Sequence, residues 1–205
     1  MPRVSGSRGG ARIVKRRSKR LLTRLAIAAA LLAAAVAGLW WYLDWRHRRE
    51  IEDRLGRHGP IIWKYAQANA LPSEFVREII RAESGGDQRA VSPKGAKGLM
   101  QVTPIALKEV RRRTDIGDGD LFDPDYNIRV GTAYFRMMLD AFDGDAYLAL
   151  AAYNMGPTRL RAARRENPDL TGRQIVEKSA PAETRAYCRK ILGTKDLKLP
   201  TTTGG

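Results

Sequence analysis

The sequence predicts an all-α protein in which a single transmembrane helix precedes one helical domain. Residues 25–43 form an apolar run without a charged side chain. Beyond residue 59, apolar residues recur at helical spacing between residues that typically begin or end helices. We find no convincing strand-like alternation and no internal repeat. The 205 residues are enough for one domain with a hydrophobic core, an anchor and tails.

The basic charge is concentrated at the N-terminus. The formal net charge is +15, and residues 1–24 contain nine Lys or Arg and no acid. Such a block beside an apolar span is typical of a cytoplasmic flank. We therefore expect residues 1–24 to be a basic cytoplasmic tail, and we expect no nucleic-acid partner.

The apolar run is long enough to be a transmembrane anchor. As a helix rising about 1.5 Å per residue, residues 25–43 come close to the roughly 30 Å apolar thickness of a bilayer. Aromatic residues that favour the headgroup region cluster at its C-terminal edge, namely Trp40, Trp41, Tyr42 and Trp45. This pattern predicts a single-pass protein of the inner (cytoplasmic) membrane with its domain in the periplasm. The alternative is a cleavable signal peptide ending at Ala35-Val36-Ala37, but the length of the run and its aromatic edge favour a retained anchor.

The segment after the anchor predicts a connector and two helices. Residues 44–59 are charged, and we expect a short helical or frayed connector there. Pro60 should begin a helix that ends near Asn69. Pro72 suits the first turn of the next helix, which Ser84 and the two glycines after it should end.

Prolines and capping residues mark the remaining helices. Residues 87–102 are rich in Gly, Ser and Pro and predict an ordered loop. Helices should begin at Thr103-Pro104 and, after a second loop, at Asp123-Pro124. Asp145 can cap an Ala-rich helix that ends at Gly156-Pro157. Further helices fit 158–166, 173–179 and 181–192, which gives a domain at 60–193 and a flexible tail at 194–205.

One carboxylate falls on the predicted buried face of a helix. Val76, Ile79 and Ile80 form the apolar stripe of the helix after Pro72, and Glu83 lies one turn beyond Ile79 and Ile80. Burial disfavours a charged carboxylate, so its pKa should rise toward neutrality. A carboxylic acid that keeps its proton near neutral pH can act as a general acid. Glu83 is therefore the candidate catalytic residue.

Three blocks of sequence carry a family resemblance. The first comprises Glu83-Ser84, Ala90-Val91-Ser92-Pro93, Gly95-Ala96, Gly98-Leu99-Met100-Gln101 and Pro104. The second is Ala152-Tyr153-Asn154-Met155-Gly156-Pro157, and the third is Glu183-Thr184-Arg185-x-Tyr187. Together they resemble the signature of the soluble lytic transglycosylase family, which has a lysozyme-like α-fold. The resemblance covers roughly residues 60–192, with the blocks in order.

The resemblance implies an enzyme that cleaves the MurNAc-β-1,4-GlcNAc bond of peptidoglycan without water. In this family the muramyl 6-hydroxyl attacks C1 and leaves a 1,6-anhydroMurNAc end. Glu83 would first protonate the glycosidic oxygen and then, as carboxylate, take the proton of that hydroxyl. No cofactor and no metal are implied. Peptidoglycan glycan strands are the expected partner, and an envelope or secretion assembly is left open.

The same blocks imply the substrate-binding residues, which are Ser92, Met100, Gln101, Tyr153, Asn154 and Tyr187. Each also has a structural interpretation. Ser92 could belong to a turn, Met100 could simply be a core residue, and Tyr153 could be a buried tyrosine with a structural partner.

Two other functions remain open. A hydrolase resembling goose-type lysozyme would need a second carboxyl group roughly 5–10 Å from the first, and the acidic loop 115–125 is the cluster to search. That loop lacks the register of a calcium-binding EF-hand. Glu183 suits the first turn of a helix, where an acid stabilises the helix dipole. The second alternative is a catalytically idle glycan-binding module of an envelope assembly.

Overall fold

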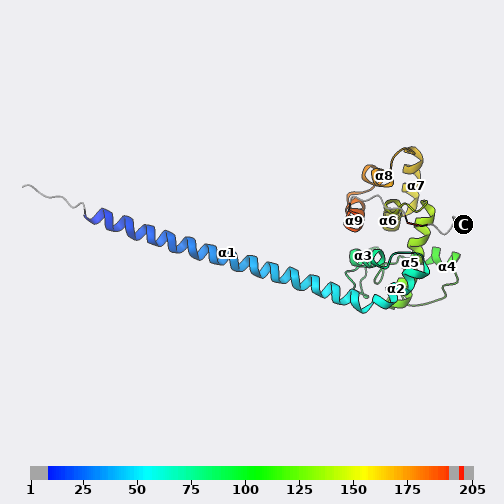
Figure 1. Ribbon diagram of the computed structural model, residues 1–205, viewed down its shortest axis with the longest axis horizontal. Helices are drawn as coiled ribbons and strands as arrows, with labels where there is room; N and C mark the ends of the chain where they lie inside the picture. The colour runs from blue at the N-terminus through cyan, green and yellow to red at the C-terminus, as the bar shows by residue number, and fades with distance from the viewer. Residues whose placement is uncertain (1–8, 194–198, 201–205) are drawn as a thin grey trace, which may run out of the picture. The chain divides into compact units, whose positions relative to one another are not determined.

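The computed structural model describes residues 9–193 and 199–200. Over these residues the protein contains nine α-helices and no strand (Figure 1), which confirms the all-α prediction. The contacts divide the chain into two units, Met1–Glu50 and Ile51–Gly205. Residues 1–8 of the expected basic tail and most of the expected flexible tail at 194–205 lie outside the described residues. Leu199 is described, and it is buried with its N–H donating to the Gly144 carbonyl over 2.9 Å.

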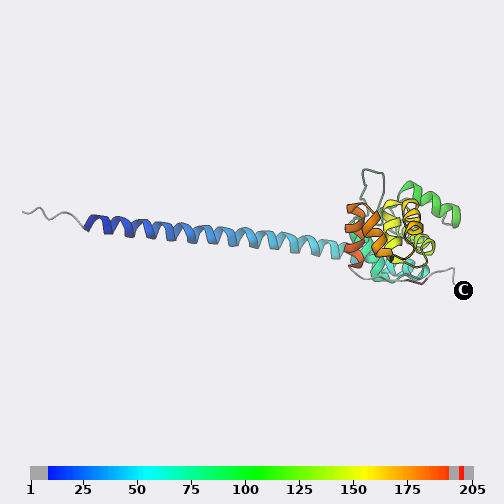
Figure 2. The same cartoon turned by 90° about the horizontal axis from the view of Figure 1, so that it is seen from above.

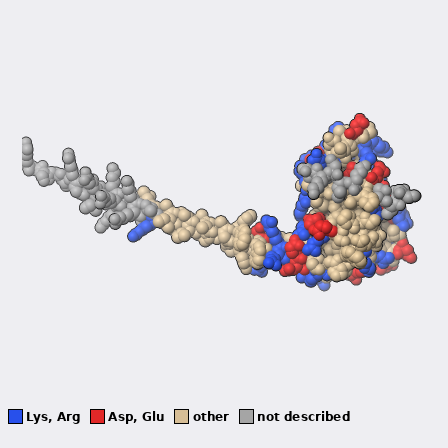
Figure 3. Space-filling view, in the orientation of Figure 1, with Lys and Arg blue, Asp and Glu red and all other residues tan. Residues whose placement is uncertain are grey.

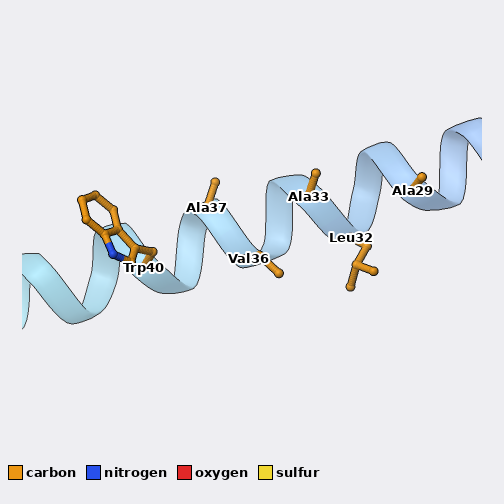
Figure 4. Close-up of a pocket in the computed structure, with 6 residues that line it drawn as sticks. All are labelled: Ala29, Leu32, Ala33, Val36, Ala37 and Trp40. Carbon is orange, nitrogen blue, oxygen red and sulfur yellow. The ribbon is translucent and has the colours of Figure 1, made fainter.

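The first unit consists of most of helix α1 (Gly9–Arg57). Within the described residues, one helical segment, Arg24–Arg57, is long and apolar enough to cross a membrane. Its side chains at 25–43 are exposed, and Figure 3 shows an uncharged stretch along this helix. In Figure 4, Leu32, Val36 and Trp40 project from this helix among small alanines. A continuous apolar surface of this extent is expected for a helix that lipid covers.

The second unit holds the remaining eight described helices: α2 (Gly59–Ala68), α3 (Ser73–Glu83), α4 (Pro104–Arg113), α5 (Pro124–Ala141), α6 (Ala146–Met155), α7 (Pro157–Glu166), α8 (Gly172–Ser179) and α9 (Ala182–Leu192). The expected capping residues begin three of them. Thr103 accepts a hydrogen bond from the Ala106 N–H, and Asp145 accepts one from the Leu148 N–H. Asp123 caps α5 in the same way. Capping bonds of this kind fix where each helix starts.

Helix α6 is the centre of this unit. Its residues from Ala146 to Ala152 are all buried, and the helix packs against α5, α7, α8 and α9 (Figures 1 and 2). Many of these residues are alanines, so neighbouring helices can approach closely on every side. The C-terminal end of α6 is thereby placed among the helices that carry the candidate site.

The residues expected to form a separate connector, 44–59, belong in part to the second unit, which begins at Ile51 rather than at 60. Leu55 is fully buried in the core. The Glu52 carboxylate pairs with Arg77 over 2.8 Å and also contacts Arg81, both on α3. Arg81 and then Arg77 lower the pKa of Glu52 to about 2. The last turns of α1 are therefore part of the fold that supports α3.

Candidate active site

Glu83 is the last residue of α3, and its position is fixed on both sides. Val76, Ile79 and Ile80 bury the apolar face of the helix, as the spacing predicted. Immediately after the helix, the Ser84 hydroxyl donates to the Leu99 carbonyl over 2.8 Å. Because Leu99 belongs to the loop at 87–102, this bond joins the end of α3 directly to that loop.

The end of α1 supports the same turn from another side. A Cβ atom at Gly86, whose φ is +76°, would lie 2.9 Å from the Arg54 Cβ. Only glycine combines this backbone conformation with so close an approach. The chain just beyond Glu83 is thus packed against the last turns of α1.

The environment of Glu83 favours its protonated form. The side chain is only partly exposed, and burial raises the pKa of the carboxyl from 4.5 to about 7. The Tyr187 hydroxyl and the Lys190 ammonium lower the pKa but do not cancel the effect of burial. The raised pKa of Glu83 agrees with the expectation, while its side chain is half-buried and not fully buried. Near neutral pH this group can both give and accept a proton.

Two tyrosines from different helices lie beside this carboxyl. Tyr153 comes from the end of α6 and Tyr187 from α9. Burial, and then the charge of Glu83, raises the pKa of both hydroxyls well above 10. The Tyr153 hydroxyl donates to the Met100 carbonyl over 2.7 Å. The Tyr187 hydroxyl is buried and has no partner with hydrogen-bond geometry among the described residues, so it is available to the carboxylate or to a ligand.

The loop at 87–102 is held by a residue that the site prediction did not include. The Asn127 side chain, on α5, accepts from the Met100 N–H over 2.8 Å and donates to the carbonyls of Lys97 and Leu121. Asn127 is buried, so these three bonds are made away from solvent. The sequence signal for this role is a polar residue on the apolar face of a helix.

The predicted substrate-binding residues of the loop have internal partners. The Gln101 amide donates to the carbonyls of Ala90 and Gly98, and its backbone φ is +45°. The Ser92 hydroxyl accepts from the Ala96 N–H over 3.0 Å. Both side chains therefore shape the loop, whatever else they contact.

Met100 and Asn154 differ most from the predicted arrangement. The Met100 side chain is fully buried, and a Cβ atom at Gly131 would lie 2.5 Å from its sulfur. This packing favours the interpretation of Met100 as a core residue. Its backbone carbonyl, which accepts the hydrogen bond from the Tyr153 hydroxyl, is the part of Met100 that lies at the candidate site. Asn154 is exposed and accepts from the Thr184 hydroxyl over 2.7 Å, which links α6 to α9.

Two acids of the loop at 115–125 form interactions with residues of the same unit. Asp125 accepts from the Tyr65 hydroxyl and pairs with Lys64 over 3.1 Å. Asp118 pairs with Arg111 over 2.8 Å. These acids interact with cations and a hydroxyl rather than with Glu83.

Comparisons with known proteins agree with this geometry. Residues 60–176 match the family described as "Transglycosylase SLT domain". The soluble lytic murein transglycosylase of Escherichia coli (strain K12) is 30% identical over 179 residues, which cover 80% of this chain and 27% of that protein. The membrane-bound lytic murein transglycosylase F of Desulfosudis oleivorans is 35% identical over 124 residues, 58% of this chain and 26% of that protein. The chain thus spans about a quarter of the length of these relatives.

A solved structure shows the same fold. It is the lytic transglycosylase Slt from Pseudomonas aeruginosa, described as an inactive Glu-to-Gln mutant. The similarity has a TM-score of 0.62 and 34% sequence identity, and it covers 66% of this chain and 23% of that one.

Proposed function

Because the chain belongs to the transglycosylase SLT family, we propose that it is a peptidoglycan lytic transglycosylase with Glu83 as its catalytic residue. The observation that carries this proposal is a partly buried carboxyl with a pKa of about 7 beside two tyrosine hydroxyls. The named relatives are lytic murein transglycosylases, and the solved relative was inactivated by a Glu-to-Gln change. These names support the proposed substrate and the proposed role of a glutamate.

In the proposed reaction Glu83 acts twice. As an acid it gives its proton to the glycosidic oxygen while the bond between that oxygen and C1 of MurNAc breaks. The muramyl 6-hydroxyl forms a new bond to C1, and its proton passes to the Glu83 carboxylate. The products are a free GlcNAc 4-hydroxyl and a 1,6-anhydroMurNAc end, and Glu83 regains its starting state. A pKa near neutrality suits a group with both tasks.

The surroundings of Glu83 support a single-carboxylate mechanism. Hydrolysing glycosidases use two carboxyl groups that flank the bond. The charged and polar neighbours that shift the pKa of Glu83 are Tyr187 and Lys190, and no second carboxylate is among them in the described part of the chain. Glu183, in the first turn of α9, is exposed. This arrangement favours the lytic reaction over the hydrolytic alternative.

The other predicted residues are proposed as supports for the substrate. The charge of Glu83 raises the pKa of the hydroxyls of both Tyr153 and Tyr187, so these two residues are the first candidates for contacts with the sugar. Ser92, Gln101 and Asn154 would present polar groups from the loop and the end of α6. Met100 would act through its carbonyl, because its side chain is buried.

We further propose that α1 is retained as an inner-membrane anchor with residues 1–24 in the cytoplasm and the catalytic unit in the periplasm. The apolar, uncharged surface of α1 and the membrane-bound relatives support this location. An envelope assembly remains an open partner class.

Mass spectrometry of digested sacculi tests the reaction. The wild-type protein should release muropeptides with anhydro ends, which are lighter by one water than reducing ends. Glu83→Gln should abolish release but keep binding to sacculi, whereas the exposed Glu183→Gln control should digest normally. Reducing ends from the wild type would instead identify a hydrolase. Normal digestion by Glu83→Gln would remove Glu83 from the mechanism.

A further inference from the structure

A hollow in the second unit is rich in arginine. It lies where α5 ends and α7 passes, and its lining residues are Ala141, Phe142, Arg161, Arg164, Arg165 and Pro168. Its volume of about 450 Å³ is within the range of small-ligand sites. None of these residues belongs to the three blocks that resemble the transglycosylase signature, so the proposed function leaves the hollow unexplained.

The three arginines form one cationic face. Arg164 and Arg165 follow Arg161 on α7 by three and four residues, which places each of them on the side of the helix that Arg161 occupies. Arg164 already contacts a carboxylate, Asp143, over 3.2 Å. No carboxylate partner is found for Arg161 or Arg165 among the described residues, and both are exposed. Exposed guanidinium groups that lack a carboxylate partner are suited to bind a carboxylate with two parallel hydrogen bonds.

The hollow is linked to the candidate active site by two electrostatic effects and one ring contact. Arg161 is close enough to Tyr134 to lower the pKa of its hydroxyl, against the raising effects of burial and Glu109. The Tyr134 ring lies with its centre 5.5 Å from the centre of the Tyr153 ring. Tyr153 in turn is influenced by the charge of Glu83. Arg161 is thus the arginine of the hollow that these observations link to the candidate site.

We propose that this hollow binds a carboxylate of the peptide stems that the glycan strand carries. The inference rests on the proposed function, because it takes peptidoglycan as the substrate. The guanidinium groups supply the charge that a stem carboxylate requires, and the lining from Ala141 and Phe142 suits the small apolar side chains of a peptide. The hollow would thus select peptide-bearing glycan over glycan whose peptides have been removed.

Turnover on two substrates tests this inference. The double variant Arg161→Gln/Arg165→Gln is compared with Arg159→Gln, which removes an exposed arginine of the same helix outside the hollow. The full-length protein is assayed on intact sacculi and on sacculi stripped of peptides by an amidase. We expect the KM of the double variant to rise about tenfold on intact sacculi only, with kcat unchanged. Equal KM values for wild type and double variant on intact sacculi would overturn the proposal, as would equal losses on both substrates.

A binding measurement keeps this inference separate from the proposed reaction. Calorimetry with a synthetic stem tetrapeptide and with its carboxamide form requires no turnover. We expect the acid form to bind more tightly than the carboxamide, and the double variant to lose that difference. If the wild type binds both forms equally, the hollow is not a carboxylate site, even where digestion proceeds as proposed. If the peptide binds as expected but sacculi are not cleaved, the proposed reaction fails and the site stands.

Discussion

Replacing Glu83 with Gln should change how the stability of the protein depends on pH. In the folded protein the pKa of Glu83 is about 7, compared with an ordinary value of 4.5. The folded state therefore binds more protons than the unfolded state between these two values, and the stability of the wild type falls as the pH rises through this window. At about 1.4 kcal/mol for each pH unit, the loss is about 3 kcal/mol. A neutral amide of the same shape has no such loss.

Urea titrations of the full-length protein in detergent micelles, followed by circular dichroism, measure this effect. The free energy of unfolding of Glu83→Gln, relative to wild type, should increase by about 3 kcal/mol between about pH 4.5 and about pH 8. The exposed Glu183→Gln control should follow the wild type at every pH. If the gap between Glu83→Gln and wild type stays constant, or if wild type becomes the more stable protein at high pH, Glu83 is not desolvated and the reasoning for a proton donor fails.

Four further outcomes follow from the same geometry. In the proposed role the Glu83 carboxyl must start protonated, so the pH profile of kcat/KM should fall about tenfold per unit above about pH 7, and a flat profile would contradict this role. Asn127→Ala removes three buried hydrogen bonds and should lower the free energy of unfolding by about 3 kcal/mol in urea titrations. Tyr153→Phe removes the hydroxyl that donates to the Met100 carbonyl and that is proposed to contact the sugar, so it should cost about 1 kcal/mol of stability and should lower kcat/KM on sacculi. Leu55→Ala should cost about 2–4 kcal/mol in thermal or urea unfolding, whereas Ile105→Ala, at a side chain that is 79% exposed, should cost under about 0.5 kcal/mol.

Local chemistry made most of the helices predictable. Thr103 and Asp145 accept the backbone N–H groups that a helix start leaves free, and each is followed by a helix as expected. The helical repeat also placed Glu83 next to Ile79 and Ile80, because residues three and four apart share a face. These inferences depend on neighbours in sequence, and such neighbours are visible without a structure.

Features that depend on distant contacts were not predictable in this way. A polar residue on the apolar face of a helix marks Asn127 as unusual, but the sequence does not show which groups it bonds, because two of its three bonds reach a loop nearly thirty residues before it. The side chain of Met100 is buried because Gly131, on α5, leaves space for it. The sequence also did not show that the second unit begins before residue 60, because Leu55 stands in a stretch dominated by charged residues. Glu52, Asp53 and Arg57 of that stretch are exposed.

The packing of α1 against the turn after Glu83 affects how shortened forms of the protein should be interpreted. A form cut at the family boundary, residue 60, would lack Leu55 and the Glu52 carboxylate as well as the apolar segment of α1. Loss of activity after such a cut would therefore not by itself show a requirement for the bilayer, because the support of α3 is lost in the same cut. A cut just before Ile51 would separate these two causes.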